Sequence, residues 1–201
     1  MSPERQALLA NLEAAFGRLA ATQRLAILRE VTDMFVAGAA NFSSEQIAAF
    51  DAIMKSLIKD VDTRALTDLS SRLSGLKCAP VEVLVRLSYD NNLAVAGPIL
   101  EKSGVLADVD LVSVAKTKGQ GHRLAIAGRS HIRPVVTEAL VESGDRAVVR
   151  KVTANAGAEF SENSFVKLVN EARKDQDLAG LMAKRPDVPE ELRPFIKLAL
   201  A

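Results

Sequence analysis

The sequence predicts an all-α fold, an α-solenoid of stacked short helix pairs with an N-terminal helical cap or bundle. Apolar residues recur with the spacing of amphipathic helices almost throughout, and no segment keeps the strict alternation of a half-buried strand. Helix-start signals, in which Ser or Pro and acidic residues precede an apolar run, return at nearly constant intervals in the second half of the chain. Such regular intervals are typical of repeat proteins.

The N-terminal region contains amphipathic segments with recognisable starts. One begins near Thr22 and reads TQRLAILREVTDMFVAGA. Ser43 precedes the next, SEQIAAFDAIMKSLIKD, and Gln46 three residues later completes the pattern of a capping box. Asp62 or Thr63 begins another, TRALTDLSSRLSGL. We therefore expect helices here, each with an apolar stripe for packing.

The repeats become visible from the apolar residue that stands just before each helix-start signal. These residues are Cys78, Leu106, Ile132, Phe160 and Val188, and their positions differ by 28, 26, 28 and 28. A shorter apolar segment precedes each signal, so the unit is a short helix, a tight turn and a longer helix. A pair of this length cannot bury its own apolar faces, whereas stacked neighbours share one core. The alternative is a bundle of unrelated helices that happen to be evenly spaced.

This periodicity divides the chain into two regions. We expect residues 76–201 to form the repeat array, in units of about 28 residues. Residues 1–75 are expected to cap the array or to serve as a docking or dimerising bundle, because terminal repeats need a covered apolar face. The two regions are expected to be continuous.

Two single residues carry local expectations. Pro98 lies inside the segment LAVAGPILEKS, and proline in a helix interior removes a hydrogen bond. That element is therefore expected to bend or to begin later than its apolar pattern suggests. Cys78 precedes a helix start on its apolar side, and we expect it to be a small buried hydrophobe.

Several segments carry a resemblance to known families. LMAKRPDVPEEL and VTANAGAEFSENSF resemble HEAT-type and leucine-rich-variant helical repeats, in which an alanine-rich short helix runs into a Pro or Ser turn. The order of REVTDMFVAGA, EVLVRLSYDNNLAVAGPILEKS and KTKGQGHRLAIAGR resembles an uncharacterised, mainly alphaproteobacterial family, a domain of unknown function. VAGPIL and HRLAIAGR are the more specific pieces. The resemblance implies a helical-repeat fold and supplies no catalytic residues.

The composition excludes several classes of protein. Lys and Arg (26) nearly balance Asp and Glu (25), and 48% of the residues are hydrophobic, which excludes a disordered tail or a polybasic chain. One cysteine and two histidines provide neither an internal disulfide nor a thiolate-rich zinc cluster. The N-terminus lacks the apolar core of a signal peptide, and no run approaches the ~18 apolar residues of a membrane span. We expect a cytoplasmic protein without a membrane segment.

No motif for catalysis is apparent. GQGHRL has too few glycines for a dinucleotide site and lacks the preceding strand that such a site requires. The chain has no GxSxG elbow, no HExxH and no paired-cysteine spacing. We therefore expect no enzyme activity, no cofactor and no metal.

One stretch of the chain, residues 116–151, is locally basic and contains both histidines. Its charged residues are Lys116, Lys118, Arg123, Arg129, Arg133, Arg146, Arg150 and Lys151 against Glu138, Glu142 and Asp145, an excess of five positive charges. Such a patch attracts phosphate or an acidic partner. The alternative is a solvated helix face whose charges neighbouring repeats balance.

The candidate site residues come from this stretch and from the ends of the short helices. They are His122, Arg123, Arg129, Arg150, Asn155 and Arg185. His122 with Arg123 has the position to bind an anion at a helix N-terminus, although a packing role for the histidine is the simpler reading. The residues that follow the short helices recur along one edge and can line a groove, yet the same residues suit capping of free carbonyls.

These observations favour a non-enzymatic helical-repeat scaffold or adaptor that binds a protein or peptide partner. Solenoids present long surfaces for binding, and no catalytic constellation competes with that interpretation. The alternative is a nucleic-acid-binding or nucleic-acid-processing protein that uses the basic stretch, although the aromatic residues that stack on bases are scarce. A third hypothesis is a regulatory subunit that senses a small anion near His122 and Arg123. The oligomeric state stays open.

Overall fold

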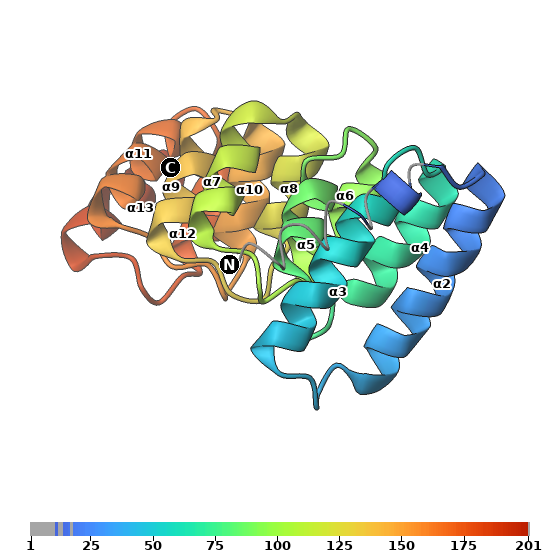
Figure 1. Ribbon diagram of the computed structural model, residues 1–201. Coiled ribbons are helices and arrows are strands. Elements are labelled where there is room, and N and C mark those ends of the chain that lie inside the picture. Colours follow the sequence, from blue (N-terminus) through green and yellow to red (C-terminus); the bar gives the residue numbers. More distant parts are fainter. Residues whose placement is uncertain (1–10, 12–13, 17, 201) are drawn as a thin grey trace. The chain divides into compact units, whose positions relative to one another are not determined.

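The computed structural model describes residues 11, 14–16 and 18–200, and over these residues the fold is an all-α helical repeat (Figure 1). Close contacts divide the chain into two compact units, residues 1–106 and residues 107–201. We call them the N-terminal and the C-terminal unit. The sequence-based boundary near residue 75 lies inside the N-terminal unit.

The N-terminal unit is built from two layers of helices. Its helices are α2 (Ala21–Gly38), α3 (Ser44–Leu57), α4 (Thr63–Leu73), α5 (Val81–Ser88) and α6 (Leu93–Lys102). In one layer α4 lies between α2 and α6, and in the other α3 contacts α5. This alternation is the arrangement expected of stacked helix pairs, because each pair covers the apolar face of the next.

Aromatic packing closes the α2–α3 corner of this unit. The ring of Phe50 lies 5.1 Å from that of Phe35 and 4.9 Å from that of Phe42, measured between centroids. Gly38 allows Phe42 to lie against α2, because a Cβ at this position would meet the ring at 2.4 Å. Phe35 is fully buried in the core, and Phe42 and Phe50 are half-buried where they pack against it.

Helix starts in the N-terminal unit follow the expected signals. Ser43 caps α3, with its hydroxyl accepting from the Gln46 amide while the Gln46 side chain accepts from the Ser43 amide, so the capping box is confirmed. Asp62 caps α4 by accepting from Ala65. Asn92 caps α6 by accepting from Ala94. Helix α6 therefore begins at Leu93 and continues through Pro98, so the later start considered for it does not occur.

Helix α5 takes its N-terminal cap from another helix. Its own N-cap residue, Pro80, supplies no side-chain acceptor. Asp51 of α3 accepts instead from the amides of Glu82 and Val83, both at 2.9 Å. Burial raises the pKa of the Asp51 carboxyl, and the two amide donors oppose that shift.

The C-terminal unit, taken by itself, is also built from two layers of helices. Its elements are α7 (Asp108–Thr117), α8 (Gln120–Ala127), α9 (Pro134–Glu142), α10 (Arg146–Ala154), α11 (Glu162–Ala172), α12 (Gln176–Ala183), the short 3₁₀ helix η1 (Glu190–Leu192) and α13 (Arg193–Leu200). Helices α7, α9, α11 and α13 contact one another in that order, and α8, α10 and α12 do the same. We call these rows the odd layer and the even layer of the C-terminal unit (Figure 1).

The helix starts of the odd layer confirm the predicted period. Their N-cap residues are Ala107, Arg133 and Ser161, with Pro189 before η1, so the spacings are 26, 28 and 28. The apolar residue before each cap is buried at Leu106, Ile132 and Val188. These side chains anchor the incoming turn to the core of the stack.

The expectation for Cys78 was wrong, because this side chain is exposed. The cap of α5 is Pro80, so the residue in the register of Ile132 is Ala79, which is buried. Because Pro80 is the N-cap, the residue that precedes the cap is Ala79, one position later in the sequence than the predicted Cys78. The spacing from Pro80 to Ala107 is accordingly 27 residues.

The described residues contain no named strand. One isolated parallel bridge joins Ile132 to Ala158, between the turns that enter α9 and α11. Of the helices described, none is at once long and apolar enough to cross a membrane.

Candidate site at the repeat junctions and the odd layer

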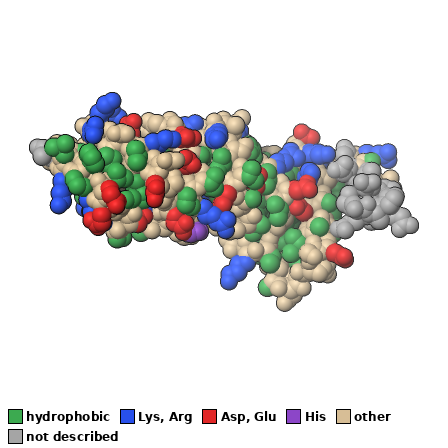
Figure 2. Space-filling view, turned by 90° about the vertical axis from the view of Figure 1, so that its left-hand side faces the viewer, with side chains coloured by type: hydrophobic (Ala, Val, Ile, Leu, Met, Phe, Trp, Pro, Cys, Tyr) green, Lys and Arg blue, Asp and Glu red, His purple; other side chains and the backbone are tan. Residues whose placement is uncertain are grey.

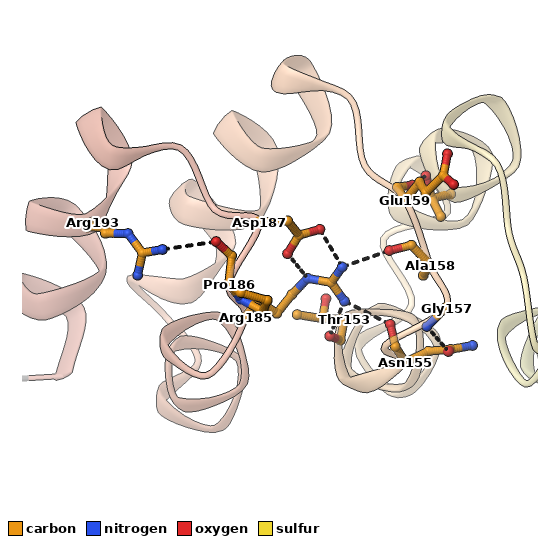
Figure 3. Close-up of polar contacts among 10 residues, drawn as sticks. Thr153, Asn155, Gly157, Ala158, Glu159, Arg185, Pro186, Asp187 and Arg193 are labelled. Atoms are coloured by element: carbon orange, nitrogen blue, oxygen red, sulfur yellow. Dashed lines mark hydrogen bonds and ion pairs between the residues drawn. The ribbon is translucent and has the colours of Figure 1, made fainter.

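Arg185 is the centre of a polar cluster at the junction of the last repeats (Figure 3). Its side chain is only 8% exposed. Nη1 donates to the carbonyls of Thr153 (3.0 Å) and Asn155 (2.8 Å), and Nη2 donates to that of Ala158 (2.7 Å). The Asp187 carboxylate takes the remaining N–H groups at 2.9 and 2.6 Å. All five guanidinium donors are thus used inside the protein.

Asn155 has the same role one repeat earlier. Its amide nitrogen donates to the carbonyls of Ala127 (2.9 Å) and Arg129 (2.7 Å), at the end of α8. Its side-chain oxygen accepts from the amide of Gly157 at 2.8 Å (Figure 3). Gly157 is required here because a Cβ would lie 2.0 Å from the carbonyl oxygen of Ser130. The side chain after one even helix therefore caps the carbonyls of the preceding one.

The last turn of the series is capped in a similar way. Arg193 donates from Nη2 to the carbonyl of Pro186 at 3.2 Å (Figure 3). For Asn155 and Arg185 the sequence left open a groove lining or a capping role, and the hydrogen bonds confirm capping. Capping depends on carbonyls 26 to 32 residues away in the chain. Local sequence patterns do not identify such partners.

Arg150 belongs to an ion-pair network rather than to an open patch. It bonds Asp175 through two N–H groups and lies 2.9 Å from the carboxylate of Asp177. Asp175 also caps α12 by accepting from Leu178. The Arg150 guanidinium lowers the pKa of the Asp175 carboxyl.

The remaining candidates are His122 and Arg123, in the first turn of α8, and Arg129, just beyond its end. His122 is buried in α8, which agrees with a packing role. Arg123 donates from Nε to the carbonyl of Ala115 at 2.8 Å, in the last turn of α7. Burial lowers the pKa of the half-buried Arg129, and the Asp108 carboxylate opposes that shift. The six candidates do not converge on one cavity.

The basic stretch is divided between the two layers. Helices α8 and α10 carry four Lys or Arg residues and no Asp or Glu, and α12 adds one Asp, so the even layer has a net charge of +3. The odd layer, with η1, carries eight acidic and four basic residues, a net charge of −4. Opposite charge on the two layers is invisible in a linear count over residues 116–151.

The odd layer also exposes a row of apolar side chains that the sequence analysis missed. The exposed fractions are 71% for Val109, 50% for Val135, 48% for Val166 and 72% for Leu198. Each comes from a different helix of the layer. Figure 2 shows one face of the molecule, where hydrophobic side chains are interspersed with charged groups. Helical-wheel positions opposite the buried stripe are the signal that identifies this row.

An open cavity of about 320 Å³ lies between the ends of α10 and α12. Its walls include Ala156, Leu181 and Pro186, with Arg185 and Asp187 at the polar side. Since those two side chains bond each other, the cavity presents mainly apolar and backbone groups.

A comparison with models of known protein families finds a match for part of the chain. The model of a family described as an uncharacterised protein conserved in bacteria matches residues 95–194. These residues match DUF2336. The resemblance to an uncharacterised bacterial family is thereby confirmed. The DUF2336 segment includes α7 to α12 in full, and hence every repeat junction described above. Neither curated proteins nor solved structures gave a significant match.

Proposed function

We propose that this chain is a non-enzymatic, cytoplasmic helical-repeat adaptor that binds a protein or peptide partner through the odd layer of its C-terminal unit. The observation that carries the proposal is the row formed by Val109, Val135, Val166 and Leu198. Single exposed apolar residues are ordinary, but exposed apolar side chains on four successive helices of one layer are a basis for proposing an interaction site.

The fate of the candidate cations supports a protein partner over a nucleic acid. Arg123 and Arg150 make hydrogen bonds inside the chain, and all the donors of Arg185 are used there. Phosphate recognition needs cations whose donors face outward. A layer with apolar side chains and net negative charge is instead suited to polypeptide.

Panning a displayed random-peptide library against the full chain tests the proposal. We expect enriched clones that bind wild type and lose at least about tenfold in affinity with Val135→Ser combined with Val166→Ser, because exposed apolar contacts supply binding energy. The matched control is Met34→Ser with Leu93→Ser, which removes exposed apolar side chains of the N-terminal unit. Absence of enrichment, or equal binding to the face variant, would contradict the proposal.

The second candidate function, nucleic-acid binding, rests on the charge of the even layer. Arg146 and Lys151 are exposed on α10. If this function holds, single-stranded RNA or DNA binds at low salt with an affinity that falls steeply as salt rises, and Arg146→Ala with Lys151→Ala reduces the slope. No binding at low salt excludes it.

A further inference from the structure

The three valines of the apolar row share one register on the odd layer. Val109 and Val135 are both the second residue of their helix, and Val166 is the fifth residue of α11. Positions two and five lie on one helix face, because three residues advance about 300° around the axis. The buried positions of α9 and α11, such as Leu140 and Leu168, lie on the opposite face. The row therefore marks the outer face of the layer.

Carboxylates accompany this row. Glu138, the fifth residue of α9, has the same register as Val166, and Glu142 lies one helical turn further along. Lys167 bonds Glu142 at 2.8 Å and lowers the pKa of that carboxyl, so Glu142 stays ionised at neutral pH. Within the odd layer, acidic residues outnumber basic residues by eight to four. A partner gains by bringing positive charge to this face.

The dimensions of the layer suit a helix. Neighbouring helices pack with axes about 8–10 Å apart, so four of them span roughly 27 Å between the outer axes. A helix of about 18 residues has the same length. A layer of helices offers no unpaired strand edge, which favours recognition through the apolar face of an amphipathic helix.

We propose that the outer face of the odd layer binds a basic amphipathic helix, whose apolar stripe covers Val109, Val135 and Val166 and whose Lys or Arg side chains face Glu138 and Glu142. This inference rests on the proposed function and specifies the chemistry of the partner. Apolar complementarity supplies affinity, and the charge determines which amphipathic helices are accepted.

Three synthetic peptides of about 18 residues test the partner chemistry. The first has a leucine stripe and lysines on its polar face, the second carries glutamates in place of the lysines, and the third is a scrambled form of the first without helical periodicity. Each is labelled and titrated with the full chain, with fluorescence anisotropy as the readout. We expect the first peptide to bind at least about tenfold more tightly than either of the others.

Two charge variants locate the site. Glu138→Lys with Glu142→Lys is expected to weaken the basic peptide by about tenfold, because each substitution replaces attraction by repulsion. Glu30→Lys with Glu101→Lys makes the same change of charge on exposed positions of the N-terminal unit and is expected to leave affinity unchanged. Circular dichroism confirms that both variants remain folded.

The outcomes separate this inference from the proposed function. Equal or tighter binding of the glutamate peptide, or a basic-peptide affinity that the face variant does not change, overturns the inference. The proposed function still holds in that case if library panning enriches peptides whose binding depends on Val135 and Val166. Self-association of the chain that Val135→Ser with Val166→Ser abolishes, measured by light scattering, would identify a second copy as the occupant and would also overturn the inference.

Discussion

Arg150 and Asp175 form a bidentate ion pair, with Nε 2.9 Å from Oδ2 and Nη2 2.7 Å from Oδ1. The pair joins the middle of α10 to the N-cap of α12. The Asp175 carboxylate therefore caps α12 and also forms an ion pair with the preceding repeat. Gln120 of α8 bonds Asp145, the N-cap of α10, at 3.0 Å. In both cases the N-cap carboxylate of an even helix bonds a side chain of the preceding even helix, in addition to the caps at the helix ends.

This pair makes the stability of the protein dependent on pH. The ordinary pKa of the Asp175 carboxyl is 3.8, and the value in the folded state is lower. Its stabilising contribution is therefore fully present above pH 3.8 and is lost as pH falls through the folded-state value. Asp175→Asn keeps a capping oxygen but removes the charge. We expect the stability difference between wild type and this variant to shrink as pH falls from 6 to about 2.5, measured by urea unfolding; a constant difference would contradict this.

Asp51 is expected to show the opposite dependence. Because burial raises its pKa in the folded state, folding favours the protonated carboxyl. Stability from this group is greatest below pH 3.8 and declines as pH rises through the folded-state value. On acidification, the wild type should therefore gain stability relative to Asp51→Asn. Over the same pH range it should lose stability relative to Asp175→Asn. The same urea series detects the contrast, and parallel curves for the two variants would refute it.

Removal of the Arg185 side chain is expected to be strongly destabilising. Arg185→Ala leaves the carbonyls of Thr153, Asn155 and Ala158 without their donor and also leaves Asp187 unpaired. We expect a loss of about 3 kcal/mol in the free energy of unfolding, since carbonyls in a buried site lose a charged hydrogen-bond donor. Arg193→Ala, which removes a 3.2 Å bond to Pro186 and an ion pair with the exposed Glu190, is the control and should cost less than about 1 kcal/mol. Equal effects would show that Arg185 is not the central cap.

Two glycines are expected to respond to alanine in opposite directions. Gly157→Ala places a Cβ 2.0 Å from the backbone oxygen of Ser130, which forces the junction apart and should cost about 2 kcal/mol. Gly180 lies inside α12 with nothing within 4 Å of its added Cβ. Gly180→Ala should therefore stabilise the protein by about 0.5 to 1 kcal/mol. Thermal unfolding measures both, and a Gly157→Ala variant as stable as the wild type would argue against the close approach at Gly157.

Much of the fold could be predicted from local signals. Ser43, Asp62 and Ser161 stand at helix starts as their side chains indicate, because N-capping depends on residues within one turn. The spacing between repeats follows from the same signals. The predicted buried residue before the helix cap was wrong at Cys78. Two small apolar residues precede Pro80 there, and the local sequence does not say which of them enters the core.

The candidate site was much less predictable. The sequence favoured capping for Asn155 and Arg185 over a groove lining, but it did not identify their acceptors, which belong to the preceding repeat. The excess positive charge over residues 116–151 combined α8 and α10 with the acidic α9 of the other layer. Only the layering shows that Val135 and Val166 share an exposed face.

Methyl NMR of the full chain, with valines labelled at their methyl groups, tests partner binding by the odd layer most directly. On addition of the basic amphipathic peptide, we predict chemical-shift changes at Val109, Val135 and Val166, while the buried Val148 and Val152 of α10 stay unchanged. Changes centred on α10, or no changes at any valine at saturating peptide, would contradict the account.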